Sequence, residues 1–86
     1  MLVKQQGKHV ESVLLLREGQ RVVAVADIAL APYTTIIRGE AGVIVDVCSE
    51  LEYCMVRWDV YHKGLAAWDN AAVIAADYMP FLMEVP

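Results

Sequence analysis

Alternating apolar and polar residues in the middle of the chain predict a β-hairpin. Residues 43–47 read Val-Ile-Val-Asp-Val, and residues 54–58 read Cys-Met-Val-Arg-Trp. β-branched and aromatic side chains at this density are typical of strands. The residues between them, 49–52, include one serine and two glutamates. They suit a tight loop, so we expect the two segments to pair antiparallel.

The register of this hairpin follows from which face is apolar. A loop at residues 49–52 places six apolar residues on one face, which are Val43, Val45 and Val47 opposite Trp58, Val56 and Cys54. The other face is mixed, as a half-buried antiparallel pair requires. The same register places Cys48 and Cys54 on opposite faces, so we expect two unlinked thiols.

Further strand and turn signals precede this hairpin. Residues 20–26 are rich in valine and predict a first strand, while residues 27–35 contain a proline and predict a long loop. Gly39 and Gly42 follow. We expect them to provide the positive φ or the bulge with which a small sheet bends.

A second hairpin is predicted by the turn that ends in Gly64, which suits the left-handed position of a G1 bulge. In that register Trp58 pairs with Trp68 on the inner face. Arg57 and Asp69 then lie opposite each other on the outer face. We therefore expect both tryptophans to pack in the core.

The ends of the chain are less regular than its middle. Residues 70–72 suit one helical turn, and residues 73–76 suit a short closing strand. Near the start, residues 10–17 fit a helix as well as a strand, because short apolar runs do not distinguish the two.

Five short strands result, joined by a long loop, a short loop, a tight turn and one helical turn. This order resembles an SH3-like barrel over residues 19–76. Gly19-Gln20-Arg21-Val22 followed by Gly39-Glu40-Ala41-Gly42-Val43 is similar to the start of many small bacterial SH3-like proteins, several of unknown function. The expected fold is one all-β domain, a small five-stranded SH3-like barrel with an N-terminal segment 1–18 and an apolar C-terminal tail 77–86.

The resemblance extends to proteins of very different activity. The same barrel occurs in the E subunit of photosystem I, the variable chain of ferredoxin–thioredoxin reductase and the plasmid-borne type II dihydrofolate reductase. That reductase carries a Val-Gln-Ile-Tyr stretch where residues 65–70 here read Leu-Ala-Ala-Trp-Asp-Asn. The reductase activity is therefore not expected, and the fold alone does not specify a function.

Composition narrows the choice of partners. Of 86 residues, 58% are hydrophobic, which exceeds the usual share of about 45–50% and predicts association with another surface. The net charge is −4 and the seven Lys and Arg residues are scattered, so we expect no nucleic-acid partner.

The apolar runs are short. All of them fall well below the ~18 residues that a membrane span needs, and the first residues lack the apolar region of a secretory signal. We therefore expect no membrane partner and a location in the cytoplasm of a bacterium-like cell.

The residue types of common catalytic sites are sparse. His9 and His62 are the only histidines, and neither has a cluster of further metal ligands near it in sequence. No nucleophile elbow, phosphate-binding loop or dinucleotide fingerprint is present. We therefore predict no catalytic residue, no metal and no cofactor. Trp58, Tyr61 and Trp68 could form an aromatic cage for a methylated cation, but core packing is favoured.

Two groups of residues are candidate binding sites. The first lies in the two loops that would flank an SH3 ligand groove, and it consists of Asp27, Tyr33, Glu50, Glu52 and Tyr53. Aromatic residues beside acids would suit an extended basic peptide. The aromatic motifs of signalling SH3 domains are missing, so solvated loops are the alternative interpretation.

The second group lies in the tail, and it consists of Tyr78, Met79, Phe81, Leu82 and Met83. An apolar tail must be covered, either by its own barrel or by a second copy, and we favour the second copy. The sequence thus predicts a non-enzymatic protein–protein interaction module that self-associates as a homodimer or larger assembly. The alternative is a small-molecule binder or enzyme whose pocket forms between subunits.

Overall fold

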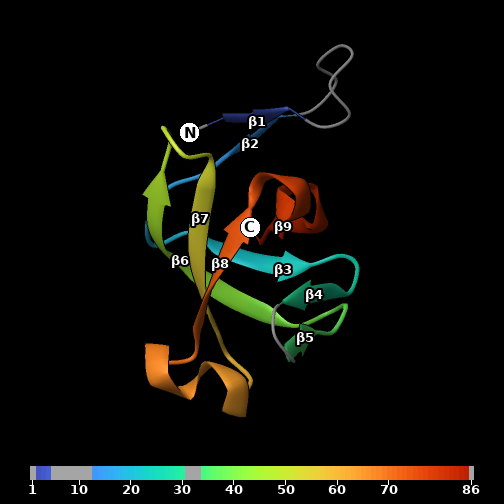
Figure 1. Ribbon diagram of the computed structural model, residues 1–86. Helices are drawn as coiled ribbons and strands as arrows, with labels where there is room; N and C mark the ends of the chain where they lie inside the picture. Colours follow the sequence, from blue (N-terminus) through green and yellow to red (C-terminus); the bar gives the residue numbers. More distant parts are fainter. Residues whose placement is uncertain (1, 5–12, 31–33, 86) are drawn as a thin grey trace.

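The computed structural model describes residues 2–4, 13–30 and 34–85 and consists mostly of β-strands. The elements in chain order are β1 (Leu2–Lys4), β2 (Val13–Leu15), β3 (Arg21–Ala24), β4 (Ile28–Leu30), β5 (Thr34–Ile36), β6 (Ala41–Cys48), β7 (Tyr53–Trp58), the 3₁₀ segment η1 (Lys63–Trp68), β8 (Ala71–Ala75), the 3₁₀ segment η2 (Ala76–Phe81) and β9 (Leu82–Glu84) (Figure 1). The predicted all-β class is confirmed.

The strands form one main sheet and two small ones. The main sheet is antiparallel with the order β8-β7-β6-β3-β9. β1 pairs with β2, which decides in favour of a strand at Val13–Leu15, and β4 pairs with β5 inside the predicted long loop. Figure 1 shows the β1–β2 pair at one end of the molecule and η1 at the other.

The register of the β6–β7 hairpin is partly as predicted. Next to the turn, Val47 lies opposite Cys54 as expected. A bulge between Ile44 and Asp46 then shifts the pairing by one residue, so that Ile44 rather than Val45 opposes Val56. The prediction that Val43 and Val45 belong to the core face was therefore wrong, because a bulge reverses the alternation of all residues beyond it.

Gly42 explains how the two strands approach beyond the bulge. It lies directly opposite Trp58. A β-carbon on Gly42 would lie 2.6 Å from the carbonyl oxygen of Arg57 and 2.7 Å from Cγ1 of Val56, so only glycine fits. Gly39 has the positive φ of +97° that was expected of one of these glycines.

The second predicted hairpin is not formed. Residues 63–68 are the 3₁₀ segment η1, and Gly64 is not among the residues with positive φ. The chain reverses instead at Asp69 and Asn70, whose φ values are +58° and +61°. Trp68 is consequently 63% exposed, so its predicted place in the core was wrong.

Asn70 replaces the glycine as the residue that fixes this turn. Its side-chain amide donates to the carbonyl oxygens of Trp58 and Val60, both at 2.8 Å, and its carbonyl accepts from the His62 N–H at 2.7 Å. Three backbone groups of an irregular loop are thereby satisfied by one side chain. Asparagine also tolerates the left-handed conformation better than most residues.

The last strand of the main sheet lies in the segment predicted to be a tail. β8 contains the predicted closing strand, but the chain continues through η2 into β9, which pairs with β3. The first and last strands of the main sheet are therefore neighbours. The predicted strand assignment was wrong by one element, because η1 occupies the place of the expected fourth strand.

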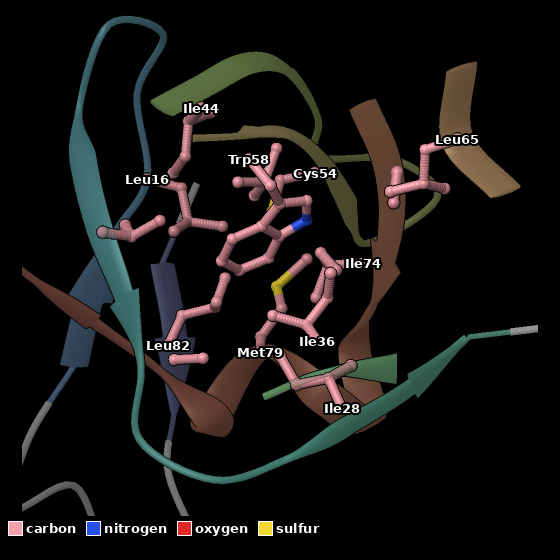
Figure 2. Close-up of a cluster of buried hydrophobic side chains, with 14 residues drawn as sticks. Leu16, Ile28, Ile36, Ile44, Cys54, Trp58, Leu65, Ile74, Met79 and Leu82 are labelled. Atoms are coloured by element: carbon pink, nitrogen blue, oxygen red, sulfur yellow. The ribbon is translucent and has the colours of Figure 1, made fainter. Parts of the chain in front are cut away.

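The core surrounds Trp58. Figure 2 shows the indole ring at the centre of a cluster of buried side chains contributed by nearly every element, and these include Leu16, Ile28, Ile36, Ile44, Cys54, Leu65, Ile74, Met79 and Leu82. Trp58 is only 2% exposed, as predicted. Met79 and Leu82 come from the C-terminal segment, so that segment covers the core with its own side chains.

Candidate functional site

An open apolar groove of about 350 Å³ runs beside β8. It is lined by Leu30, Met55, Leu65, Trp68, Ala71, Ala72 and Val73. None of these side chains carries a charge. Trp68 from η1 and Val73 from the middle of β8 are the most exposed of them, at 63% and 48%. Such a surface suits apolar side chains of a partner and offers no group for acid–base chemistry.

The groove coincides with an open edge of the main sheet, because β8 ends the strand order. The Trp58 N–H donates to the Asn70 carbonyl oxygen at 3.1 Å, in register with the β7–β8 ladder. Hydrogen-bonded pairs alternate along an antiparallel ladder. Ala72 and Ile74 therefore direct their backbone groups to β7, and the alternate residues of β8 direct theirs to the open edge.

The outward-directed residues of β8 are Ala71, Val73 and Ala75. Within the described part of the chain, Ala71, Val73 and the Ala75 N–H have no backbone partner outside the β7–β8 pair, whereas the Ala75 C=O stands at the N-cap of η2 and accepts the first hydrogen bond of that segment. The site thus combines apolar walls with a row of available hydrogen-bonding groups. This combination is what an added strand recognises.

A polar cluster lies away from the groove, where the turn before β6 meets the loop after β7. Nε2 of His62 lies 2.7 Å from Oε1 of Glu40, and both side chains are largely buried. The other carboxylate oxygen of Glu40 accepts from the Ile37 N–H at 2.9 Å. Arg21 and Asp59 form a bidentate ion pair at 2.9 and 3.2 Å. These contacts join the turns at the ends of the strands.

This cluster has a structural role, because it links the turn before β6 to the loop after β7. Both oxygens of the Glu40 carboxylate are engaged, and among the described residues no cysteine, serine or threonine forms a hydrogen bond with His62. Over the residues with described positions, no group of three His, Cys, Asp or Glu side chains could hold a metal ion. Nothing in the sequence signalled the Glu40–His62 contact, because the two residues are far apart in the chain.

The acidic residues of the predicted peptide site lie at opposite ends of β6. The Asp27 carboxylate accepts from the Arg38 N–H at 2.8 Å, just before β6 begins. Glu50 and Glu52 lie in the turn after β6 ends. Eight residues of strand separate them, which is roughly 25 Å at the usual rise. The structure does not bring these acids together.

The aromatic residues of that predicted site contribute no groove either. Tyr33 lies outside the described residues. Tyr53 lies opposite Cys48 at the end of the β6–β7 ladder. The neighbouring Cys48, burial and Asp46 together raise the pKa of the Tyr53 hydroxyl above its ordinary value.

The five tail residues have unequal surroundings. Met79 and Leu82 are buried in the core, and Tyr78 and Phe81 pack against it with their ring centroids 5.4 Å apart. Met83 is 55% exposed. Of these five residues, Met83 is therefore the one most available to a second chain.

The remaining candidate side chains are separated in space. Trp58 is enclosed by the core while Tyr61 and Trp68 are exposed, so the three do not form an aromatic cage.

Cys48 and Cys54 are both free, as the register predicted. Burial raises the pKa of the Cys54 thiol to about 11, which keeps it protonated and unreactive at neutral pH.

Comparison of the chain with protein-family models, curated proteins and solved structures finds no match. A search of the described residues also finds no helix long and apolar enough to cross a membrane. The function must therefore be argued from the groove and the strand edge beside it.

Proposed function

We propose that this protein is a non-enzymatic, SH3-like interaction module that works by binding protein chains, including copies of itself. The observation that carries the proposal is the apolar groove along the open edge of β8. It offers apolar contacts and backbone hydrogen bonds, which are the two features that a protein strand can use.

The SH3-like assignment is supported by the order of connections. A long connection with β4 and β5 follows β3, a short turn follows β6, and η2 precedes the closing strand β9. β9 returns beside β3, the first strand of the main sheet. The resemblance rests on the order long loop, short loop, tight turn, helical turn and closing strand, and all of these have a counterpart except the tight turn, whose place between β7 and β8 is taken by η1.

A binding role is favoured over catalysis by the chemistry of the groove. Its lining contains no ionisable side chain, whereas an acid–base or nucleophilic site needs one. The two free thiols agree with a reducing compartment such as the cytoplasm, which is the location we propose.

Self-association is tested by light scattering after gel filtration over a range of protein concentrations. We expect a mass above the 9.5 kDa of one chain, rising with concentration. A mass of one chain at every concentration would overturn the self-associating part of the proposal.

Acrylamide quenching gives a second readout. Trp58 is buried, so quenching at low concentration reports Trp68. We expect that quenching to weaken as the protein associates. The Trp68→Phe variant leaves Trp58 as the single tryptophan, and with excitation selective for tryptophan it serves as the control for this assignment.

A further inference from the structure

We infer that a second copy of this chain pairs its β8 with the open edge of β8, antiparallel and across a two-fold axis at Val73. This inference rests on the proposed self-association and names the surface and geometry that produce it. The paired strands would join the two main sheets into one continuous sheet. The occupant of the edge is thus an identical strand of a second copy.

The positions of the outward-directed residues make this edge self-complementary. Ala71 and Ala75 are equidistant from Val73 along the strand. In a two-fold antiparallel pairing, Val73 meets Val73 of the partner subunit, and Ala71 meets the partner subunit's Ala75. Each hydrogen-bonded pair exchanges two N–H···O bonds. All the outward-directed groups of the strand therefore find partners at once, and the Ala75 C=O, which also accepts the first hydrogen bond of η2, uses its second lone pair.

The side chains of the strand allow this close approach. The strand reads Ala-Ala-Val-Ile-Ala and contains no charge and no proline. Its pairing with β7 contains no bulge. Natural proteins usually protect an open edge with one of these features. Their absence from β8 leaves an edge that accepts another strand without repulsion.

The opposite edge of the sheet differs in each respect. β9 has three residues, Leu82–Glu84, and its Glu84 forms an ion pair with Arg17 at 3.3 Å. A two-fold pairing through β9 would bring like charges near one another over a short contact. Charge and length both favour β8 as the edge that pairs.

The net charge of −4 per chain opposes association at long range, and salt screens such repulsion. The β8 pairing itself consists of backbone hydrogen bonds and apolar contacts, which salt does not weaken in the same way. We therefore expect association of this kind to strengthen as the salt concentration rises.

Amide hydrogen exchange tests the pairing residue by residue. We expect the amides of Ala71, Val73 and Ala75 to exchange at least about tenfold more slowly at high than at low protein concentration. Ala72 and Ile74, which bond to β7 within the chain, are the internal control and should change much less.

The mass measured on the same samples distinguishes a wrong interface from an absence of self-association. Fast, concentration-independent exchange at these three amides in a sample heavier than one chain would reject the β8 edge but keep self-association. The same exchange in a sample of single-chain mass would reject both.

A cysteine cross-link gives an independent test in a Cys48→Ser background, since Cys54 is buried. Val73→Cys would place two thiols across the axis on α-carbons about 5.5 Å apart, within reach of a disulfide. We expect oxidation to yield a covalent dimer. The control is Met83→Cys, at a more exposed site on β9, and it should yield little covalent dimer. Cross-linking of Met83→Cys alone would overturn the inference and assign the interface to β9.

Discussion

Trp58 and Trp68 are separated by ten positions in the chain and have opposite surroundings. Trp58 lies at the centre of the core and is 2% exposed, whereas Trp68 stands at the rim of the groove and is 63% exposed. Trp58 is the last residue of β7 and Trp68 is the last residue of η1, and η1 carries the second tryptophan out of the core. The core around Trp58 stabilises the fold, and the rim around Trp68 is left available for a partner.

The largest expected effect is at Trp58. Trp58→Ala should lower the free energy of unfolding by about 3–5 kcal/mol, because a large cavity remains. Small domains have about 5–15 kcal/mol in total, so the variant should be close to unfolded. Urea denaturation followed by circular dichroism measures the loss.

Two further variants sharpen this comparison. The Trp58 indole Nε1 has no hydrogen-bond partner among the described residues, so Trp58→Phe removes no hydrogen bond to them and should cost less than Trp58→Ala. Trp68→Ala should leave stability within about 0.5 kcal/mol, as for other surface changes, and should weaken self-association. A loss at Trp68 comparable to that at Trp58 would contradict the division between core and rim.

The C-terminal segment offers a matched pair of neighbouring residues. Leu82→Ala should cost about 2–5 kcal/mol, as expected for a buried leucine. Met83→Ala, one residue later and exposed, should change stability by less than about 0.5 kcal/mol. Thermal denaturation of both variants compares them directly. Equal, small effects would show that this segment does not contribute to the core.

The close contact at Gly42 gives the next effect. Gly42→Ala adds a β-carbon that would lie 2.6 Å from the Arg57 carbonyl oxygen, and overpacking of this kind costs about 1–3 kcal/mol. Gly19→Ala is the control for positive φ without a clash, since nothing lies within 4 Å of the added carbon. If Gly42→Ala were as stable as the wild type, the pairing of Gly42 with Trp58 would be wrong.

The residues around these sites show which parts of the fold the sequence could predict. The hairpin turn at 49–52 and the burial of Trp58 followed from local alternation and from the size of the side chain. The bulge at Val45 did not, because residues 43–45 read Val-Ile-Val, so that either face of this short run can be buried and either register is permitted. Alternation specifies a register only where the two faces differ.

The last part of the chain and the groove could not be derived in the same way. The turn at Asn70 depends on three hydrogen bonds to distant backbone groups, and the composition of residues 63–68 does not reveal them. Moving the turn exposes Trp68, creates the groove and makes β9 the closing strand. The candidate site therefore follows from a tertiary contact that local sequence patterns do not contain.

The smallest expected effect, at the Arg57–Asp69 ion pair, reports on the open edge itself. The two side chains meet at 3.1 Å and are 50% and 82% exposed, so water and salt weaken their attraction. A double-mutant cycle with Arg57→Ala and Asp69→Ala should give a coupling of about 0–1 kcal/mol in dilute protein. Arg21 and Asp59, paired at 2.9 Å on another part of the surface, are the reference pair.

Arg57 lies directly opposite Ala71 at the start of β8, so a second β8 strand would partly shield this ion pair from water. Its coupling should therefore rise above the dilute value at protein concentrations where the mass exceeds one chain. The coupling between Arg21 and Asp59 should not rise. A coupling at Arg57–Asp69 that stays the same in the associated protein would mean that the β8 edge remains open to solvent, and the contact between copies would then lie elsewhere.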